Sequence, residues 1–337
     1  MQYIEAQKPQ FKANLHSHST LSDGHLTPEQ LARLYREHGY AVLAITDHEA
    51  PYDNSALSTP DFLMLTGYEA YIRPQANGHM DPYGPEIHLN LLSREPHNRT
   101  FIAYDPNFCK YMPHELAESL PQAGQKGPRS YTPAYINGFI RDARKAGYLV
   151  TYNHPCWSME SDERILQYEG CFSLEIFNTG SQKINGYECN GALYDRMLRA
   201  GKPLFCHGSD DNHNVHPVGD ALCDSFGAWT MILADRLDYD SVINALEHGD
   251  FYASTGPTIT ELSIEGSKVH LACTPAARVV MLSSPKRGQS VYDPAGQSVC
   301  SADFEIPDSA PYVRFSVLAK DGTAAHTRAF FRSELGI

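Results

Sequence analysis

Several common sequence signals are missing from this chain of 337 residues. Its eight cysteines form no C-x-x-C pair, which argues against a disulfide framework. Cys156, Cys171 and Cys206 lie in or near apolar runs and are expected to be reduced, buried thiols. The chain also has no Gly-rich dinucleotide loop and no P-loop, which argues against a Rossmann fold or an NTPase.

The chain also lacks long apolar runs and clusters of basic residues. No segment approaches the roughly 18 apolar residues of a membrane span. Residues 1–14 lack the apolar core of a signal peptide. The formal net charge is −13 and no Lys/Arg-rich run is present, which argues against nucleic acid or an anionic membrane as the main partner. We therefore expect a cytoplasmic protein that binds neither.

Apolar runs and amphipathic helical patterns alternate from residue 13 to about residue 250. The run at 40–48, YAVLAITDH, is typical of a strand buried on both faces. Before it, Thr27 and Pro28 predict the capped start of a helix. Such alternation indicates a parallel sheet with helical crossovers. Because polar residues recur at the ends of about seven strands, we predict an α/β fold of the (β/α)7 TIM-like barrel type over residues 1–256.

Two segments depart from this pattern. Residues 96–133 are rich in Pro, Asn, Tyr and Lys, with one weak helical stretch near residues 114–120, and are expected to form an inserted loop or lid. From residue 257 to residue 337, short alternating runs are separated by Gly, Pro and Asp turns. That composition predicts a small antiparallel β-sandwich domain.

Acidic and imidazole side chains gather at the predicted strand ends. His16 and His18 are two residues apart, so along a strand they face the same side. Carboxylates and histidines at one end of successive strands would repel one another and be costly to bury unless cations bind there. The expected metal ligands are His16, His18, Asp23, His48, Glu69, His88, His154, Asp211 and His213.

The order of these motifs resembles the PHP (polymerase and histidinol phosphatase) family. The matching pieces are NLHSHSTLSDG at 14–24, TDH at 46–48, GYE at 67–69, NHP at 153–155 and DNH at 211–213. The resemblance covers roughly residues 12–256 and implies a metal-dependent phosphoesterase with a distorted (β/α)7 barrel. EHGDFYASTGP and YVRFSVLAKDG, nearer the C-terminus, resemble a subgroup that includes members acting on carbamate esters.

The resemblance also implies how two or three divalent ions, zinc, manganese or iron, would be held. The first would bind His16, His18, Glu69 and Asp211, the second Glu69, His88 and His154, and the third Asp23, His48 and His213. Asp210 is an alternative to Asp211, and Asp-x-His spacing favours Asp211. His79 is an alternative to His88.

The predicted reaction follows from charge. Three divalent ions and three carboxylates leave a residual charge near +3, which would attract a small anionic phosphate mono- or diester. Such ions can activate a water molecule for hydrolysis. The expected catalytic side chains are His207 or His213, as a proton donor to the leaving group, and Asp47, which would orient a ligand histidine.

The substrate pocket is harder to predict. Its candidate residues are Asn153, Trp157, Asn178 and His216, together with Arg99, Lys110 and Arg129 of the insertion. A hydrolase of carbamates, esters or amides that uses the same metal centre is an alternative function. A non-catalytic binding module is another.

Overall fold

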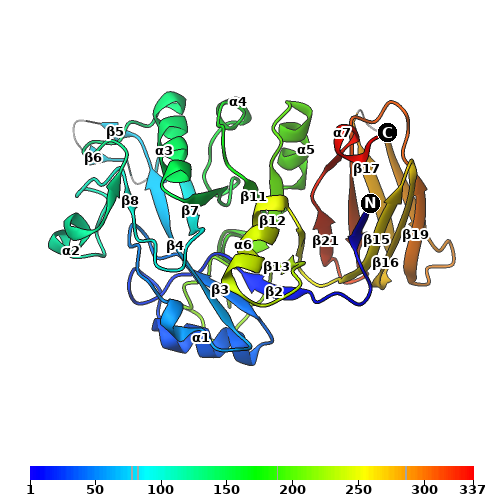
Figure 1. Cartoon of the computed structure of the whole chain (residues 1–337), viewed down its shortest axis with the longest axis horizontal. Helices are drawn as coiled ribbons and strands as arrows, with labels where there is room; N and C mark the ends of the chain where they lie inside the picture. The colour runs from blue at the N-terminus through cyan, green and yellow to red at the C-terminus, as the bar shows by residue number, and fades with distance from the viewer. Residues whose placement is uncertain (77–78, 82, 188, 285–286) are drawn as a thin grey trace.

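The computed structural model describes residues 1–337 except 77–78, 82, 188 and 285–286, and the side chains of residues 76, 79, 80 and 287 are also outside the description. Figure 1 shows an α/β region beside a β-rich region, and both ends of the chain lie in the β-rich region. Among the described residues, no helix combines the length and apolar character that crossing a membrane requires.

The α/β region is built on one curved sheet. Its strands lie in the order β12 (Phe205–Ser209), β11 (Ser173–Asn178), β10 (Tyr148–Tyr152), β7 (Ile87–Ser93), β4 (Leu63–Ile72), β3 (Val42–Ile45), β2 (Phe11–Asn14) and β13 (Trp229–Ile232). Strands β2, β3 and β4 are parallel, as are β10, β11 and β12. The region therefore has the predicted α/β character, while the seven-stranded barrel stays a prediction.

The prediction of a parallel sheet throughout is wrong at two strands. Strand β7 runs antiparallel to both β4 and β10, and β13 runs antiparallel to β2. Among its described residues, the connection from β4 to β7 contains no helix and has the short strands β5 (Gln75–Ala76) and β6 (His79–Met80). Without a helical crossover a strand returns beside its neighbour in the opposite direction.

Strand β12, at one end of this order, approaches β2, which is next to the other end, at the loops that follow the two strands. Ser17 forms an isolated parallel bridge with Asn212. The Asp211 amide donates to the His16 carbonyl at 2.9 Å, and the His18 amide donates to the Asn212 carbonyl at 3.0 Å. The sheet therefore curls far enough to place two histidine-bearing loops side by side.

The helix predicted to start at Thr27 and Pro28 is present as α1 (Pro28–Glu37), and the stretch predicted near residues 114–120 is α2 (His114–Ser119). The other helices are α3 (Pro133–Lys145), α5 (Gly191–Arg199) and α6 (Tyr239–His248), with the shorter η1 (Ser55–Leu57), α4 (Asp162–Ile165), the π-helical η2 (Ser181–Asn185) and α7 (Arg332–Leu335). Thr27 and Gln30 form the reciprocal capping box that starts α1. Its buried face, with Leu31 and Tyr35, packs toward the sheet.

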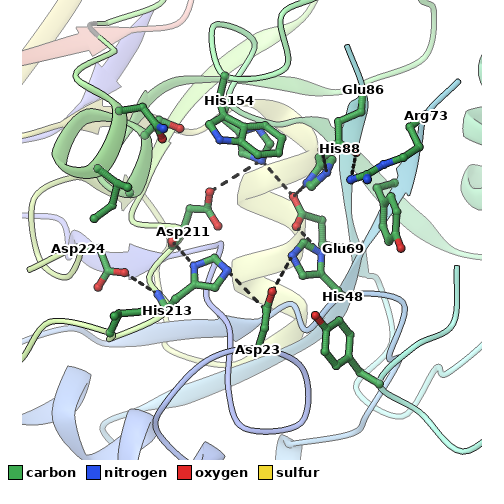
Figure 2. A pocket seen from close by; sticks show the side chains of 18 of the residues that line it. Asp23, His48, Glu69, Arg73, Glu86, His88, His154, Asp211, His213 and Asp224 are labelled. Carbon is green, nitrogen blue, oxygen red and sulfur yellow. Dashed lines mark hydrogen bonds and ion pairs between the residues drawn. The ribbon is translucent and has the colours of Figure 1, made fainter. Parts of the chain in front are cut away.

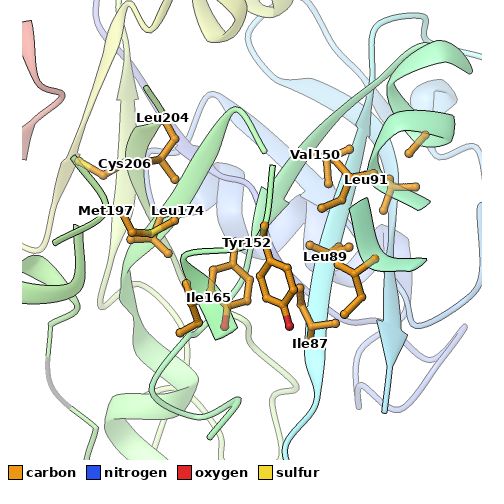
Figure 3. Close-up of a cluster of buried hydrophobic side chains, with 14 of the residues drawn as sticks. Ile87, Leu89, Leu91, Val150, Tyr152, Ile165, Leu174, Met197, Leu204 and Cys206 are labelled. Carbon is orange, nitrogen blue, oxygen red and sulfur yellow. The ribbon is translucent and has the colours of Figure 1, made fainter. Parts of the chain in front are cut away.

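A buried apolar cluster supports the outer side of β7 and β10 (Figure 3). Ile87, Leu89 and Leu91 alternate along β7 and pack beside Val150 and Tyr152 of β10. Because neighbouring strand residues face opposite sides, this register turns His88 away from the cluster, toward the other face of β7. Of the three cysteines expected to be buried, Cys206 is buried and Cys171 is intermediate, but Cys156 is exposed because it lies in the loop after β10.

The insertion has its own small core. It contains β8 (Phe101–Ile102), α2 and β9 (Gln122–Ala123), and the weak helical stretch predicted near residues 114–120 is α2. Phe101, Tyr104, Cys109 and Met112 are buried together beside Ala50, which follows the TDH motif. The segment is thus packed onto the loop that carries His48.

The C-terminal region consists of antiparallel strands in two layers around a shared apolar core. One sheet has the order β1 (Gln2–Ile4), β15 (Ile259–Glu265), β16 (Lys268–Ala276), β19 (Val299–Glu305). The other contains β14 (Phe251–Ser254), β21 (Ala324–Thr327), β20 (Tyr312–Leu318), β17 (Arg278–Ser283) and β18 (Arg287–Tyr292), with β22 (Phe330–Phe331) on β20. Because β14 also pairs with β13, one sheet continues across the predicted boundary at residue 256.

Candidate metal centre

The structure brings all nine predicted ligand residues together at one end of the curved sheet. All of them except His16 and His18 line a pocket of about 610 Å³ (Figure 2). They come from the ends of β2, β3, β10 and β12 and from within β4 and β7. In the described part of the chain the possible ligand atoms form four groups, and within each group all of these atoms lie within 4.8 Å of one another. The groups are His18, Asp23, His48 and His213; His16, His18 and Glu69; His16, His154 and Asp211; and His48, Glu69 and His88.

Glu69 stands at the centre of this cluster and is fully buried. Five imidazoles approach its carboxylate: Oε1 lies 3.2 Å from His16 Nε2, 3.2 Å from His88 Nδ1 and 3.3 Å from His154 Nε2, and Oε2 lies 3.0 Å from His48 Nδ1 and 3.5 Å from His18 Nε2. The two oxygens therefore face different sets of rings, an arrangement that suits a carboxylate shared between two cations.

Asp211 adds a second carboxylate. Its Oδ1 lies 3.1 Å from the Nε2 atoms of both His16 and His18. Asp211 has φ +53° and His154 has φ +24°, in the left-handed region that residues other than glycine seldom adopt. Strained backbone of this kind is retained where the surrounding contacts hold it, and it is common at functional sites.

Asp23 closes the open side of the cluster. One of its oxygens lies 3.5 Å from His213 Nε2 and 3.8 Å from His18 Nδ1, and the other lies 3.7 Å from His48 Nε2. Unlike Glu69, the Asp23 side chain is about one-third exposed, at 35%. This group faces the pocket mouth.

The choice between adjacent aspartates is decided by their contacts. Asp210 is buried away from the cluster and accepts hydrogen bonds from the Tyr35 hydroxyl, the Thr179 hydroxyl and the amides of 226–228. It holds the loop in place, whereas Asp211 faces the histidines. The side chain of His79, the alternative to His88, lies outside the described residues.

Crowding shifts the pKa values of the rings in opposite directions. Burial, together with the neighbouring His213 and His48, lowers the pKa of His18 to about 3. Burial opposes charge on His88 too, but the Glu69 carboxylate outweighs it and raises the His88 pKa to about 10. Without a cation, the cluster would have to hold protons among closely packed acids and rings.

Several buried polar atoms of the cluster have no hydrogen-bond partner of acceptable geometry within the described part of the chain. They are His18 Nδ1, Asp23 Oδ1, His48 Nδ1, Glu69 Oε2, both ring nitrogens of His88, and His154 Nδ1. Orphaned buried polar atoms are rare because they forgo solvation without compensation. Imidazole nitrogens and carboxylate oxygens are ligands for zinc, manganese and iron, so the donor set fits divalent metal ions.

Glu175 supports the cluster, and the sequence analysis did not identify it. One oxygen lies 2.7 Å from His16 Nδ1, and the other accepts from the His154 amide at 2.8 Å and from Asn178 Nδ2 at 2.9 Å. Although burial opposes ionisation, His16 outweighs it and lowers the Glu175 pKa to about 2. An acidic residue within the apolar run SLEIF was the available signal.

Of the side chains predicted to be catalytic, His213 lines the pocket, whereas His207 and Asp47 lie outside its lining. His207 is fully buried, with Nδ1 2.8 Å from Ser173 Oγ and Nε2 3.9 Å from Glu175. Burial lowers its pKa to about 4. Asp47 accepts hydrogen bonds from Ser19 and Ser22 rather than from a ligand histidine, so it braces the loop between His18 and Asp23.

The four predicted substrate residues divide into two pairs. Asn153 is buried and donates to Glu69 Oε1 at 2.6 Å. Asn178 is also buried and donates to the carboxylates of Glu175 and Asp211. Both amides therefore orient carboxylates of the cluster. Trp157 and His216 line the pocket. The Trp157 ring packs edge-on against two imidazoles, with its centroid 5.0 Å from that of His88 and 4.8 Å from that of His154.

The three basic residues of the insertion have different positions. Lys110 lines the pocket, whereas Arg99 donates to the Pro51 carbonyl and Arg129 is buried against Glu49. The pocket also contains Tyr71, Arg73, Glu86 and Tyr111, which the sequence analysis did not predict. The hairpin and turn that present them have no motif of their own.

No known family model matches this chain. Among curated proteins, the 5′-3′ exoribonuclease of Haemophilus influenzae is 27% identical over 144 residues, which is 41% of this chain and 50% of that enzyme. The chain thus spans about half the length of the curated relative it matches.

Solved structures similar to this one include three bacterial proteins described as metal-dependent phosphoesterases or as an amidohydrolase. A two-domain protein of Bacteroides vulgatus containing a predicted PHP-like metal-dependent phosphoesterase is 14% identical, with 97% of this chain and 96% of that chain covered and a TM-score of 0.43. A protein of Bifidobacterium adolescentis described as a metal-dependent phosphoesterase is 16% identical, with 65% and 94% covered and a TM-score of 0.40. An amidohydrolase of Chromobacterium violaceum with bound sulfate is 18% identical, with 60% and 87% covered and a TM-score of 0.37.

Proposed function

We propose that the protein is a metal-dependent hydrolase that cleaves small phosphate mono- or diesters. One observation carries this proposal: eight acid and imidazole side chains meet around Glu69, and several buried polar atoms of this cluster have no hydrogen-bond partner among the described residues. In the same proposal the curled sheet is a distorted (β/α)7 barrel, and the C-terminal strands form a separate sandwich domain. The cytoplasmic location also stays a prediction.

The chain's own residues would hold two or three cations in the groups predicted from the motifs. When bound, such cations activate a water molecule and stabilise the negative charge that develops on phosphate. Glu69 would be shared between two sites, since its two oxygens face different rings. Glu175 holds His16, and Asn153 holds Glu69, so the ligand geometry is set before any ion arrives.

The pocket wall supports an anionic substrate of modest size. Lys110 lines the pocket with no carboxylate partner among the described residues, whereas Arg73 is paired with Glu86. Trp157 offers an aromatic edge and His216 an imidazole outside the four ligand groups. We propose that Lys110, Trp157 and His216 contact the substrate and that His213, at the mouth, rather than the buried His207, faces the leaving group.

The test is turnover of aryl phosphates by protein loaded separately with zinc, manganese or iron. We expect hydrolysis of an aryl phosphate mono- or diester that a chelator abolishes and added metal restores. Activity restricted to carbamate or carboxyl esters would establish the alternative hydrolase instead. Metal-loaded protein without activity on any of these substrates would favour a binding module.

A second candidate substrate is an RNA end, because the curated relative is named as an exoribonuclease. The net charge of −13 and the single unpaired cation of the described pocket lining, Lys110, argue against it. A short 5′-phosphorylated oligoribonucleotide added to the same assay distinguishes the two. Preferred cleavage of that oligonucleotide would overturn our expectation that the protein does not act on nucleic acid.

A further inference from the structure

A buried ion pair joins the insertion to the loop of the candidate metal centre. Arg129, in the insertion, is 4% exposed, and Glu49, next to His48, is fully buried. Arg129 Nη1 donates to Glu49 Oε1 at 2.5 Å, and Nη2 donates to Oε2 at 2.7 Å. This two-point geometry fixes the relative orientation of both groups.

Arg129 is itself held on several sides. Its Nη1 also donates to the Tyr71 carbonyl at 2.7 Å, and its Nε donates to the Ala103 carbonyl at 3.3 Å. The guanidinium lies over the Phe108 ring, 4.6 Å from its centroid. The side chain therefore connects strand β4 with two parts of the insertion.

Glu49 continues the connection to the metal centre. Its φ of +49° makes the turn after His48 a strained one. The turn is pinned to β4 at two points: the Glu49 amide donates to the Glu69 carbonyl at 2.8 Å, and the Glu49 carboxylate accepts from the Tyr71 amide at 2.9 Å. The second point depends on a buried carboxylate, which needs a cationic partner to remain in place.

We propose that Arg129 is a positioning residue for the candidate metal centre. By neutralising Glu49 it holds the strained turn, and thereby keeps His48 Nδ1 at 3.0 Å from Glu69. This inference rests on the proposed function for the meaning of the cluster. It makes the insertion a fixed part of the centre, in contrast to the mobile lid that a long irregular segment suggests.

A matched comparison tests the proposal. Arg314 is also buried, and its Nε and Nη2 donate to Asp195 at 2.7 Å each, far from the cluster in the fold. Arg129→Met and Arg314→Met each remove one buried two-point ion pair. We expect both to lower the Tm of the chelator-treated protein.

Only Arg129→Met should change the centre. We expect about a tenfold loss of Mn²⁺ affinity, measured by competition with a fluorescent chelator, and faster amide exchange at residues 47–50 in the metal-free protein. Equal Mn²⁺ affinity and equal exchange in both variants would overturn the positioning role. If Arg129→Met does not fold, Glu49→Gln, which keeps the side-chain shape, is measured against Asp195→Asn with the same expectations.

The two proposals fail in different ways. Wild-type protein that binds Mn²⁺ but hydrolyses no phosphoester would overturn the proposed function and leave the affinity comparison intact. Wild-type protein that binds none of zinc, manganese and iron would also overturn the proposed function. Amide exchange at residues 47–50 would then decide the positioning role by itself.

Discussion

Two buried carboxylates of this protein have opposite surroundings. Glu160 accepts hydrogen bonds from the Tyr131 hydroxyl at 2.6 Å, the Tyr152 hydroxyl at 2.8 Å, the Tyr168 hydroxyl, and Arg164 Nε at 3.0 Å. Glu69 is surrounded by five imidazoles, and one of its oxygens, Oε2, has no hydrogen-bond partner among the described residues. Both side chains are fully buried.

The difference separates a structural polar cluster from a ligand site. Both oxygens of Glu160 accept hydrogen bonds, and Arg164 supplies the opposite charge, so this carboxylate has its partners within the chain. Around Glu69 the ring nitrogens gather in groups whose atoms lie within 4.8 Å of one another, and several of these nitrogens have no hydrogen-bond partner among the described residues. Such a cluster is complete only with an additional cation.

The largest expected effect is at Glu69. Glu69→Gln removes the shared negative charge while keeping the side-chain size, and we expect metal binding to be lost and phosphoesterase activity to fall by a factor on the order of 10³ or more. Metal content after gel filtration and turnover of an aryl phosphate measure this. A variant that keeps full metal content would show that Glu69 is no more a ligand than Glu160 is.

Removing Glu160 should instead affect folding. Glu160→Ala leaves buried tyrosine hydroxyls and Arg164 without their acceptor, and we expect the free energy of unfolding to fall by about 3 kcal/mol. Urea denaturation of the chelator-treated protein measures this loss. Metal content of the folded variant serves as the control, and a loss of metal as complete as in Glu69→Gln would remove the distinction between the two clusters.

Glu175 lies between these extremes, because it is satisfied by donors and also holds ligand residues. Glu175→Gln keeps an acceptor oxygen but weakens the contacts to His16 and the His154 amide. We expect a 10- to 100-fold loss of metal affinity with the fold retained. Calorimetric titration with Mn²⁺ and a circular dichroism spectrum check both parts, and unchanged affinity would assign Glu175 a purely structural role.

The smallest effect concerns two buried histidines with opposite pKa shifts. Burial lowers the pKa of His326, in β21, to about 3, whereas Glu69 overcomes burial to raise that of His88 to about 10. A histidine in the unfolded chain has a pKa near 6.5. Between about pH 6.5 and pH 3, His326 is therefore protonated in the unfolded chain but neutral in the folded protein. Stability should therefore fall by about 1 kcal/mol per pH unit on acidification from this residue alone.

Urea denaturation between pH 7 and pH 5.5 checks this, with His326→Gln expected to flatten the dependence. His88 has the opposite sign: in metal-free protein its raised pKa stabilises the fold below about pH 6.5, and that contribution is lost as pH rises through about 10. Because a metal must displace the His88 proton, Mn²⁺ affinity should increase with pH. Affinity independent of pH would contradict a ligand role for His88.

The sequence was most informative where local rules apply. Thr27 and Pro28 predicted the start of α1, and the motif residues at strand ends predicted which side chains would meet. It was least informative about strand direction. The pattern of β7 is that of a buried strand in either direction, and its reversal follows from a connection after β4 in which the described residues form no helix. Glu175 and Arg129 were missed as supporting residues because their partners lie far away in the chain.

By itself, the sequence determined the chemistry available to this protein: imidazoles and carboxylates at the ends of predicted strands, a net charge of −13 and no Lys/Arg-rich run. Only the tertiary structure decided which of those polar groups have hydrogen-bond partners within the chain. Asp210 and Asp211 are neighbours with the same side chain, yet one is surrounded by hydroxyl and amide donors and the other faces histidines. The reason is physical: whether a buried polar atom is satisfied depends on groups that distant segments bring to within about 3 Å of it, and no local pattern encodes those groups.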